Sequence, residues 1–397
     1  MIFNSLGSNY DFGFVIRSFF AISLGGESSK LRRFLDKKYQ GKTALLYKGR
    51  EAIKLALEIS GVPKVSNVGV NGFTCFVVYQ AITEAGYNPV YLDINGRNLN
   101  FDIKNLRRGG DIRALIIQNT LGNPVDIVAI KSFCDKNKIL LIEDLAHSVG
   151  SIYSNGVEAG CIGDFVALSF SQDKIVDAVS GGALVVRNKK FVSFLNNIKY
   201  TTLPLNNQIH DRFYPQLTFI IRKLYPLGIG KPLHLFLKKI KALSDPIGTI
   251  STIKYHYLPE WYSFLINLKF LQLDEEIKHK KMITNIYLEN INKKVISPQV
   301  KDNFEASSNI RFPIFVKDRD NLIHFLKNNG VFVSDIWYDA PVAPAKLTNE
   351  TDYGGECPNS ELVSRQILNL PTHINVSKRD AEKISALINK WLNMNQE

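Results

Sequence analysis

Short apolar runs alternate with amphipathic segments between about residues 42 and 188. The apolar runs at 115–117 and 140–142 predict buried strands, and the spacing of apolar positions over 127–137 between them predicts a helix. This alternation is typical of a mainly parallel sheet with helical crossovers. The same pattern predicts further strands at 44–47, 68–70, 89–92, 165–170 and 183–187, and further helices at 51–59 and 75–85.

The pattern changes after about residue 200. A stretch rich in Leu, Ile, Tyr, Pro and Lys covers 200–260, and a long helical pattern then runs over 261–292. A strand at 310–316 and helices at 319–328 and 381–392 predict a small α+β unit. We therefore expect a large α/β domain over 1–260, with a divergent insert at about 200–260, and a small C-terminal domain over 261–397.

Composition narrows the class of protein. The chain has 397 residues, 45% hydrophobic and 22% charged, which is an ordinary globular balance. Its four cysteines form no CxxC pair and no zinc-ligand spacing, so we expect no metal site and a reducing, cytoplasmic location. Asp11 and Arg17 interrupt the first apolar stretch, and no uncharged apolar run reaches ~18 residues, so we expect neither an export signal nor a membrane span.

The formal charge of +12 is unevenly spread. From Arg212 to Lys241 there are seven Lys/Arg and no acid. Such a surplus can attract nucleic acid, an anionic membrane or phosphorylated substrates, and no nucleic-acid recognition module accompanies it. Leu233, Phe236, Leu237 and Ile240 share one helical face, which favours a core-facing helix over a peripheral membrane contact through 212–243, with both interpretations open.

Three stretches carry candidate chemistry at the carboxyl ends of predicted strands, where open α/β sheets bind ligands. Asp144 follows the apolar run 140–142, so its carboxylate can face the crevice and keep a pyridine nitrogen protonated, although a helix cap would look the same. Lys174 lies five residues after Ser169 and before Gly181-Gly182. A partly desolvated lysine can condense with an aldehyde, whereas most lysines are merely solvated.

The third stretch is Tyr47-Lys48-Gly49-Arg50-Glu51, at a strand–turn–helix junction. Free N–H groups at the start of a helix form a seat for phosphate, and glycine permits close approach. Arg50 adds a guanidinium to the same turn.

Taken together, the chain resembles the DegT/StrS family of pyridoxal-phosphate-dependent (PLP-dependent) sugar aminotransferases over roughly residues 28–200 and 265–393. The resemblance rests on eight matching stretches: 71–76, 89–94, 118–124, 142–150, 163–164, 169–174, 357–359 and 367–373. It implies a fold-type-I aminotransferase, which is an α/β fold with a large mainly parallel sheet and a smaller C-terminal α+β domain, and a homodimer with PLP as cofactor.

Position by position, the resemblance implies that Lys174 is the Schiff-base lysine and moves the proton, that Asp144 pairs with the ring nitrogen and that His147 lies against the ring oxygen. Ser169 and the turn formed by Gly49, Arg50 and Glu51 are implied to hold the phosphate. The position that often stacks an aromatic ring on the cofactor falls on Cys75, next to Phe76.

A Gly-Tyr-Asn stretch that reaches the neighbouring subunit's cofactor in this family is missing between Lys199 and Lys269. The implied reaction moves an amino group, with glutamate as the expected donor, onto a nucleotide-linked keto-sugar for cell-surface polysaccharide or glycoconjugate biosynthesis. Sugar-dehydrating relatives carry histidine in place of the lysine, so Lys174 argues against that branch. The alternatives are another PLP-dependent reaction on sugars, or a catalytically silent PLP-fold protein that serves as a membrane or assembly partner.

Overall fold

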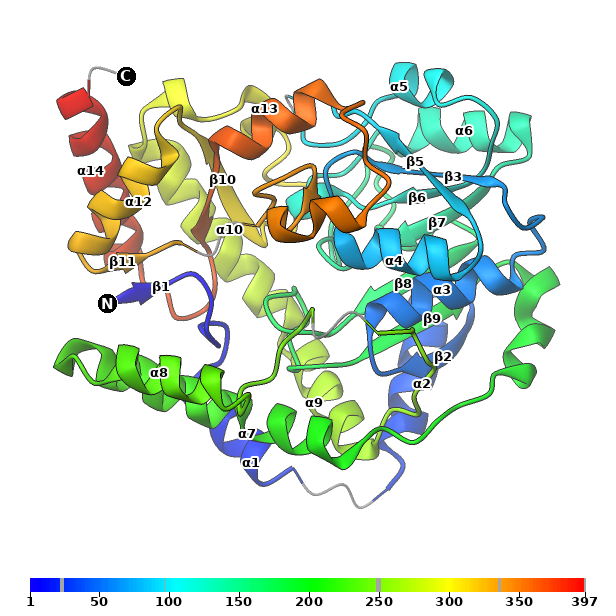
Figure 1. The fold of residues 1–397 in the computed structure, drawn as a ribbon, viewed down its shortest axis with the longest axis horizontal. Helices are drawn as coiled ribbons and strands as arrows, with labels where there is room; N and C mark the ends of the chain where they lie inside the picture. Colours follow the sequence, from blue (N-terminus) through cyan, green and yellow to red (C-terminus); the bar gives the residue numbers. More distant parts are fainter. Residues whose placement is uncertain (22–24, 97, 248–250, 335–336, 396–397) are drawn as a thin grey trace.

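A seven-stranded sheet organises the larger part of the molecule and lies in the right-hand half of Figure 1. The computed structural model describes residues 1–21, 25–96, 98–247, 251–334 and 337–395. The strand order is β2-β9-β8-β7-β6-β3-β5. Strand β9 pairs antiparallel with both β2 and β8, and the other neighbours pair parallel. The strands are β2 (Lys42–Leu46), β3 (Asn67–Asn71), β5 (Asn88–Leu92), β6 (Ile112–Ile117), β7 (Leu140–Asp144), β8 (Phe165–Ser169) and β9 (Gly182–Val186).

Alternate residues of the strands point to opposite faces of this sheet, and each face has its own apolar core. Leu141 and Leu168 pack on the face covered by α2 (Glu27–Tyr39), α6 (Ile127–Asn137) and α9 (Glu260–Leu271). Ile142 and Ala167 pack on the other face, against α3 (Gly49–Ile59) and α4 (Phe76–Glu84). Because both faces are covered, the strands are continuously apolar, as the sequence pattern indicated.

A third apolar core lies in the C-terminal part of the chain (Figure 1). It is formed by α10 (Leu273–Asn290), α12 (Arg319–Asn328), α14 (Lys378–Asn395) and an antiparallel pair of strands, β10 (Arg311–Phe315) with β13 (Ile367–Pro371). The first residues of the chain join this core, since β1 (Ile2–Phe3) pairs parallel with β11 (Val331–Phe332). The division of the chain at residue 260 stays a prediction.

The predicted strands and helices of the central sheet are confirmed within a few residues, as are β10, α12 and α14. The long helical pattern over 261–292 forms two helices, α9 and α10, which meet at Gln272. Further elements were not predicted: α1 (Phe12–Phe19), α2, β4 (Thr74–Cys75), α5 (Ile103–Arg108), α7 (Leu205–Leu224), α11 (Pro298–Asp302), β11, β12 (Val342–Ala343), α13 (Pro358–Gln366) and β13.

The 200–260 segment folds mainly as α7 and α8 (Gly230–Lys239) at the periphery of the molecule (Figure 1). Helix α7 packs against α1, and α8 packs against α7. The favoured interpretation of a core-facing helix is wrong for α8: within it only Gly230 is buried, and Leu235 and Phe236 are exposed. No helix in the described part of the chain is both long and apolar enough to cross a bilayer.

Candidate active site

Lys174 lies in the loop that joins β8 to β9. Its Nζ is 3.2 Å from Nε2 of His147 and 4.9 Å from the ring centroid of Trp337. Burial lowers the pKa of the Lys174 ammonium, while the charge of Asp144 acts in the opposite direction. A larger share of this amine is therefore neutral at neutral pH than of an exposed lysine, as a nucleophilic amine requires.

Asp144 is the last residue of β7 and is buried. One carboxylate oxygen accepts from the backbone N–H of Ala146 at 3.0 Å, and the other lies 3.5 Å from Nε2 of Gln118. Burial raises the pKa of this carboxyl, whereas the bond from Ala146 and the charge of Lys174 lower it. A cation placed against this carboxylate would favour its ionised form.

His147 is held from three sides. Its ring stacks on Trp337 with centroids 5.0 Å apart and an interplanar angle of 11°, and its Nδ1 lies 3.2 Å from the hydroxyl of Tyr338. The hydroxyl of Ser308 donates to its backbone carbonyl at 2.8 Å. Burial, followed by the charges of Lys174 and Arg311, lowers the pKa of His147 well below its usual value. The imidazole is therefore neutral and orients the Lys174 amine without adding charge.

Gly49 opens α3 directly against Ser169. A Cβ on Gly49 would lie 2.7 Å from Cβ of Ser169, and a Cβ on Gly182 would lie 2.5 Å from the carbonyl carbon of Lys48. These contacts require glycine, because real Cβ atoms do not approach so closely. The start of α3 and the Ser169 hydroxyl thus lie side by side.

Arg50 and Glu51 are engaged with the 200–260 segment. The Arg50 guanidinium donates to the carbonyls of Pro246 and Ile247 at 2.9 Å each. Glu51 accepts from the backbone N–H of His256 at 3.0 Å, and its other oxygen lies 3.0 Å from Nδ1 of that histidine. Their contact with phosphate stays a prediction. The structure shows in addition that both side chains bind the 200–260 segment.

Cys75 and Phe76, at the start of α4, have different surroundings. The Cys75 thiol lies close enough to Lys174 and Tyr338 to influence the pKa of each, so it belongs to the neighbourhood of the lysine. Phe76 is buried and pairs with the ring of Tyr79 at 5.8 Å. The stacking position at Cys75 thus lies near the site, and Phe76 packs in the protein interior.

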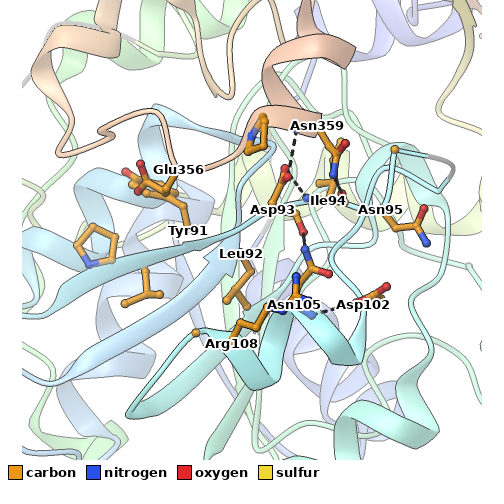
Figure 2. Close-up of a pocket in the computed structure, with 15 residues that line it drawn as sticks. Tyr91, Leu92, Asp93, Ile94, Asn95, Asp102, Asn105, Arg108, Glu356 and Asn359 are labelled. Carbon is orange, nitrogen blue, oxygen red and sulfur yellow. Dashed lines mark hydrogen bonds between the residues drawn. The ribbon is translucent and has the colours of Figure 1, made fainter.

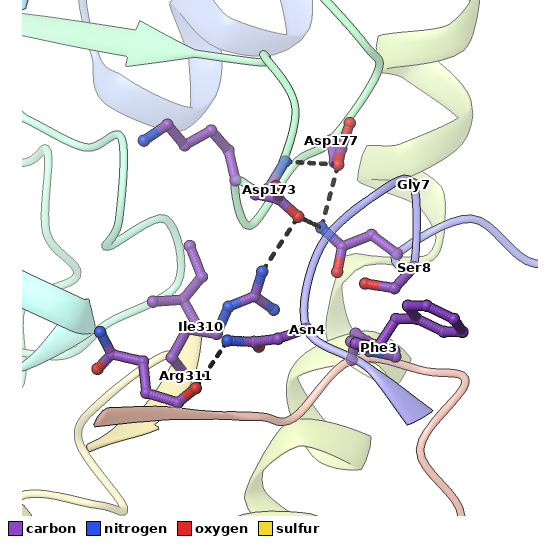
Figure 3. Close-up of polar contacts among 12 residues, drawn as sticks. Phe3, Asn4, Gly7, Ser8, Asp173, Asp177, Ile310 and Arg311 are labelled. Atoms are coloured by element: carbon purple, nitrogen blue, oxygen red, sulfur yellow. Dashed lines mark hydrogen bonds and ion pairs between the residues drawn. The ribbon is translucent and has the colours of Figure 1, made fainter. Parts of the chain in front are cut away.

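A buried polar network braces the lysine loop (Figure 3). Arg311 on β10 forms an ion pair with Asp173 at 3.0 Å, and Asn9 lies 3.4 Å from the same carboxylate oxygen. Asp177 accepts from the backbone N–H of Asp173 at 2.8 Å and from the hydroxyl of Tyr10 at 2.7 Å. Residues from the N-terminal segment and from β10 thus fix the position of the loop.

Sequence reasoning missed Trp337, Tyr338, Arg311 and the role of Gln118. The first three come from the C-terminal part of the chain, more than 130 residues after Lys174 in the sequence. Gln118 lies in the stretch 118–124, which contributes to the family resemblance, and this match was the sequence signal that could have identified it as a site residue. Its Oε1 is buried with no hydrogen-bond partner among the described residues.

Two cavities of similar size lie near the sheet. The first, about 990 Å³, lies at the end of β5 beneath α13 (Figure 2). The Asp93 carboxylate in this cavity accepts hydrogen bonds from the backbone N–H groups of Asn359 and Ser360. These bonds link the end of β5 to the start of α13. The second cavity, about 980 Å³, is lined by Lys48, Arg50, Gln172 and Asp173 and therefore reaches the candidate site.

Lys174, Asp144, Gln118, Ser169 and Gly49 fit pyridoxal phosphate. The aldehyde needs a reachable amine, the ring nitrogen needs a carboxylate, and the phosphate needs donors at a close-approach turn. The structure provides the partly buried amine of Lys174, the carboxylate of Asp144 and the Oε1 of Gln118, which has no partner among the described residues. It also provides the glycine cradle beside Ser169.

Comparisons with known proteins agree with this geometry. The chain is 24% identical over 328 residues to the pleiotropic regulatory protein of Geobacillus stearothermophilus, covering 81% of this chain and 77% of that protein. It is 23% identical over 355 residues to the GDP-perosamine synthase of Vibrio cholerae, covering 87% and 85%. The fold matches an aminotransferase from Psychrobacter cryohalolentis with a TM-score of 0.75 and 15% identity, covering 97% of each chain.

The sequence model of one family covers most of the chain, at residues 16–216 and 255–389. These ranges contain Gly49, Asp144, His147, Ser169 and Lys174. The fold-type-I α/β architecture predicted from the sequence is also that of the structural neighbours. The protein therefore belongs to the DegT/DnrJ/EryC1/StrS aminotransferase family, whose cofactor is pyridoxal phosphate.

Proposed function

We propose that the protein transfers an amino group, with glutamate as donor, to a nucleotide-linked keto-sugar in the synthesis of a cell-surface polysaccharide or glycoconjugate. The observation that carries the proposal is the partly buried Lys174 amine, which contacts His147 and is influenced by the charge of Asp144. Relatives named GDP-perosamine synthase and dTDP-sugar transaminase support the substrate class. The same comparisons favour an enzyme over a catalytically silent scaffold.

Each residue has a defined part in this chemistry. The bound cofactor supplies an electron-withdrawing ring next to the carbon that loses its proton. The Lys174 amine holds that proton and returns it, and the neutral imidazole of His147 orients the amine. Asp144 stabilises positive charge at the ring nitrogen. Gly49 and Ser169 would hold the phosphate, and the ring of Trp337 lies beside the Lys174 amine.

A direct assay tests the proposed reaction. Purified protein is incubated with PLP, glutamate and a panel of keto-sugar nucleotides, and release of 2-oxoglutarate is measured. We expect release that depends on one class of sugar nucleotide, and elution of the protein as a homodimer on a calibrated gel-filtration column. Absence of release across a broad panel, with cofactor visibly bound, would contradict the proposal.

We further propose that the protein is cytoplasmic and contacts an anionic membrane through 212–243. Leu235, Phe236 and Ile240 are exposed on and beside α8, next to Lys231 and Lys239. Exposed apolar side chains flanked by lysines are typical of helices that lie in a membrane interface.

Replacing Leu235 and Phe236 together with serine tests the membrane contact. We expect the wild-type protein to co-sediment with vesicles that contain anionic lipid, and the double variant to stay in the supernatant. Neutral vesicles serve as the control. Equal recovery of both proteins in the supernatant with anionic vesicles would contradict the contact.

A further inference from the structure

The cavity beside the phosphate turn is lined by an unusual number of cations. It measures about 980 Å³ and lies between the turn at Lys48, the end of α8 and the segment that carries Ser334 and Lys346. Ligand sites in proteins commonly measure about 300–1,000 Å³. Six Lys and Arg side chains line it: Lys48, Arg50, Lys238, Lys241, Lys254 and Lys346.

The acids that line the same cavity are already neutralised or hydrogen-bonded inside the protein. Glu51 contacts His256, and Asp173 is paired with Arg311. Asp211 accepts from the hydroxyls of Tyr47 and Tyr262, each at 2.7 Å. The remaining acid, Asp245, accepts from the backbone N–H of Ile247 at 3.0 Å.

The lining cations have no such carboxylate partners. None of the ion pairs between side chains in the described ranges includes any of the six. An uneven balance of this kind gives the cavity a positive potential, and low-dielectric walls strengthen it. The cavity is therefore suited to an anion with more than one negative charge.

Half of these cations lie outside the part of the chain that the family model matches. The match ends at residue 216 and resumes at residue 255, whereas Lys238, Lys241 and Lys254 lie between these limits. These three lysines therefore belong to the part of the insert that the family model does not match.

The cavity also connects with the lysine loop. Gln172 and Asp173, directly before Lys174, contribute to its lining. Nε2 of Gln172 donates to the hydroxyl of Ser244 at 3.0 Å, which ties the loop to the insert. A sugar attached to an anion in this cavity would thus lie next to the loop that carries the reactive amine.

From these observations we infer that the insert builds a subsite for the diphosphate of the nucleotide-sugar substrate, with Lys238 and Lys241 as phosphate ligands. The inference rests on the proposed function, because it names the part of the protein that holds the substrate of that reaction. Ammonium groups form strong charge-assisted hydrogen bonds to phosphate oxygens. The nucleoside diphosphate is thus held by one wall of the cavity while its sugar extends toward Lys174.

A matched pair of double variants tests the subsite. Lys238→Glu with Lys241→Glu changes the cavity wall, and Lys231→Glu with Lys239→Glu makes the same change of charge in the same region outside the cavity lining. All four side chains are exposed, so neither variant disturbs a core. Binding of UDP, GDP and dTDP to the PLP-loaded protein is measured by calorimetry, with the matching monophosphates and nucleosides for comparison.

We expect the wild-type protein and the Lys231/Lys239 variant to bind one nucleoside diphosphate similarly, and its monophosphate more weakly. The Lys238/Lys241 variant should bind that diphosphate about 100-fold more weakly, at roughly tenfold for each charge-assisted contact. Equal losses in both variants would show an effect of net charge alone and overturn the inference. Unchanged binding in the cavity variant, or no binding of any diphosphate by the wild-type protein, would also overturn it.

The binding readout is independent of turnover. If the protein binds a diphosphate through Lys238 and Lys241 but releases no 2-oxoglutarate, the subsite stands and the proposed reaction is refuted. If the wild-type protein transaminates but the Lys238/Lys241 variant binds the diphosphate as tightly as the wild type, the proposed reaction stands and the subsite is refuted.

Discussion

Replacing Lys174 with alanine is expected to lower the rate of transamination by at least about 100- to 10,000-fold, the usual contribution of a positioned proton-transfer group. The amine is partly buried, its pKa is lowered by desolvation, and it lies 3.2 Å from Nε2 of His147. None of the other lysine hydrogen bonds in the described ranges reaches His147. Release of 2-oxoglutarate, measured with the substrate found in the panel assay, gives the rate.

Covalent labelling separates this role from a loss of folding. Borohydride reduction of the PLP-loaded protein should leave the label on Lys174, as read by peptide mapping. Lys189→Ala removes an exposed lysine just after β9 and should keep both the label and the rate. A wild-type protein in which residue 174 stays unlabelled would refute the assignment, as would a Lys174→Ala variant that retains the wild-type rate.

Replacing Arg311 with methionine is expected to reduce the free energy of unfolding by about 3–5 kcal/mol, the usual cost of removing one partner from a buried ion pair. The side chain of Arg311 is 3% exposed and that of Asp173 is 15% exposed, so the carboxylate would be left with little solvent. The change also loosens the loop that carries Lys174 (Figure 3). Urea denaturation followed by circular dichroism measures the stability, and the transamination assay measures the accompanying loss of rate.

An exposed ion pair supplies the control for Arg311. Arg365 pairs with Glu361 at 3.3 Å, but its side chain is 73% exposed. Arg365→Met should therefore cost only about 0–1 kcal/mol. Adding Asp173→Asn to Arg311→Met should recover part of the lost stability, because it removes the negative charge that the Arg311 guanidinium had balanced. Equal stability of the Arg311 and Arg365 variants would show that the buried pair does not brace the loop.

The local pattern of the chain was enough to place the sheet and part of the candidate site. Each strand of the central sheet is an apolar run bounded by polar residues, and burial on both faces makes such runs easy to identify. Asp144 and Ser169 end two neighbouring parallel strands, β7 and β8. Because the carboxyl ends of parallel strands meet at one edge, their positions in the sequence already predicted that their side chains lie near one another.

The insert and the loop network required the tertiary structure. Leu233, Phe236, Leu237 and Ile240 have the spacing of a core-facing helix, yet Phe236 and Ile240 are exposed because α8 packs mainly on α7 at the periphery. Arg50 and Glu51 are predicted phosphate ligands, and the structure shows that both side chains also bind the insert. Periodicity shows which side of a helix is apolar, but it does not show what lies opposite that side.

The sequence by itself thus determined the elements of the sheet, the candidate lysine and the carboxylate expected opposite it. Only the tertiary structure decided that Trp337 and Tyr338 hold His147, that Arg311 and Asn9 brace Asp173, and that lysines of the insert line a cavity beside the phosphate turn. The physical reason is the distance along the chain between the residues that interact. Strand and helix patterns arise from neighbouring residues, whereas these contacts join segments that are distant along the chain and meet only when the apolar cores pack.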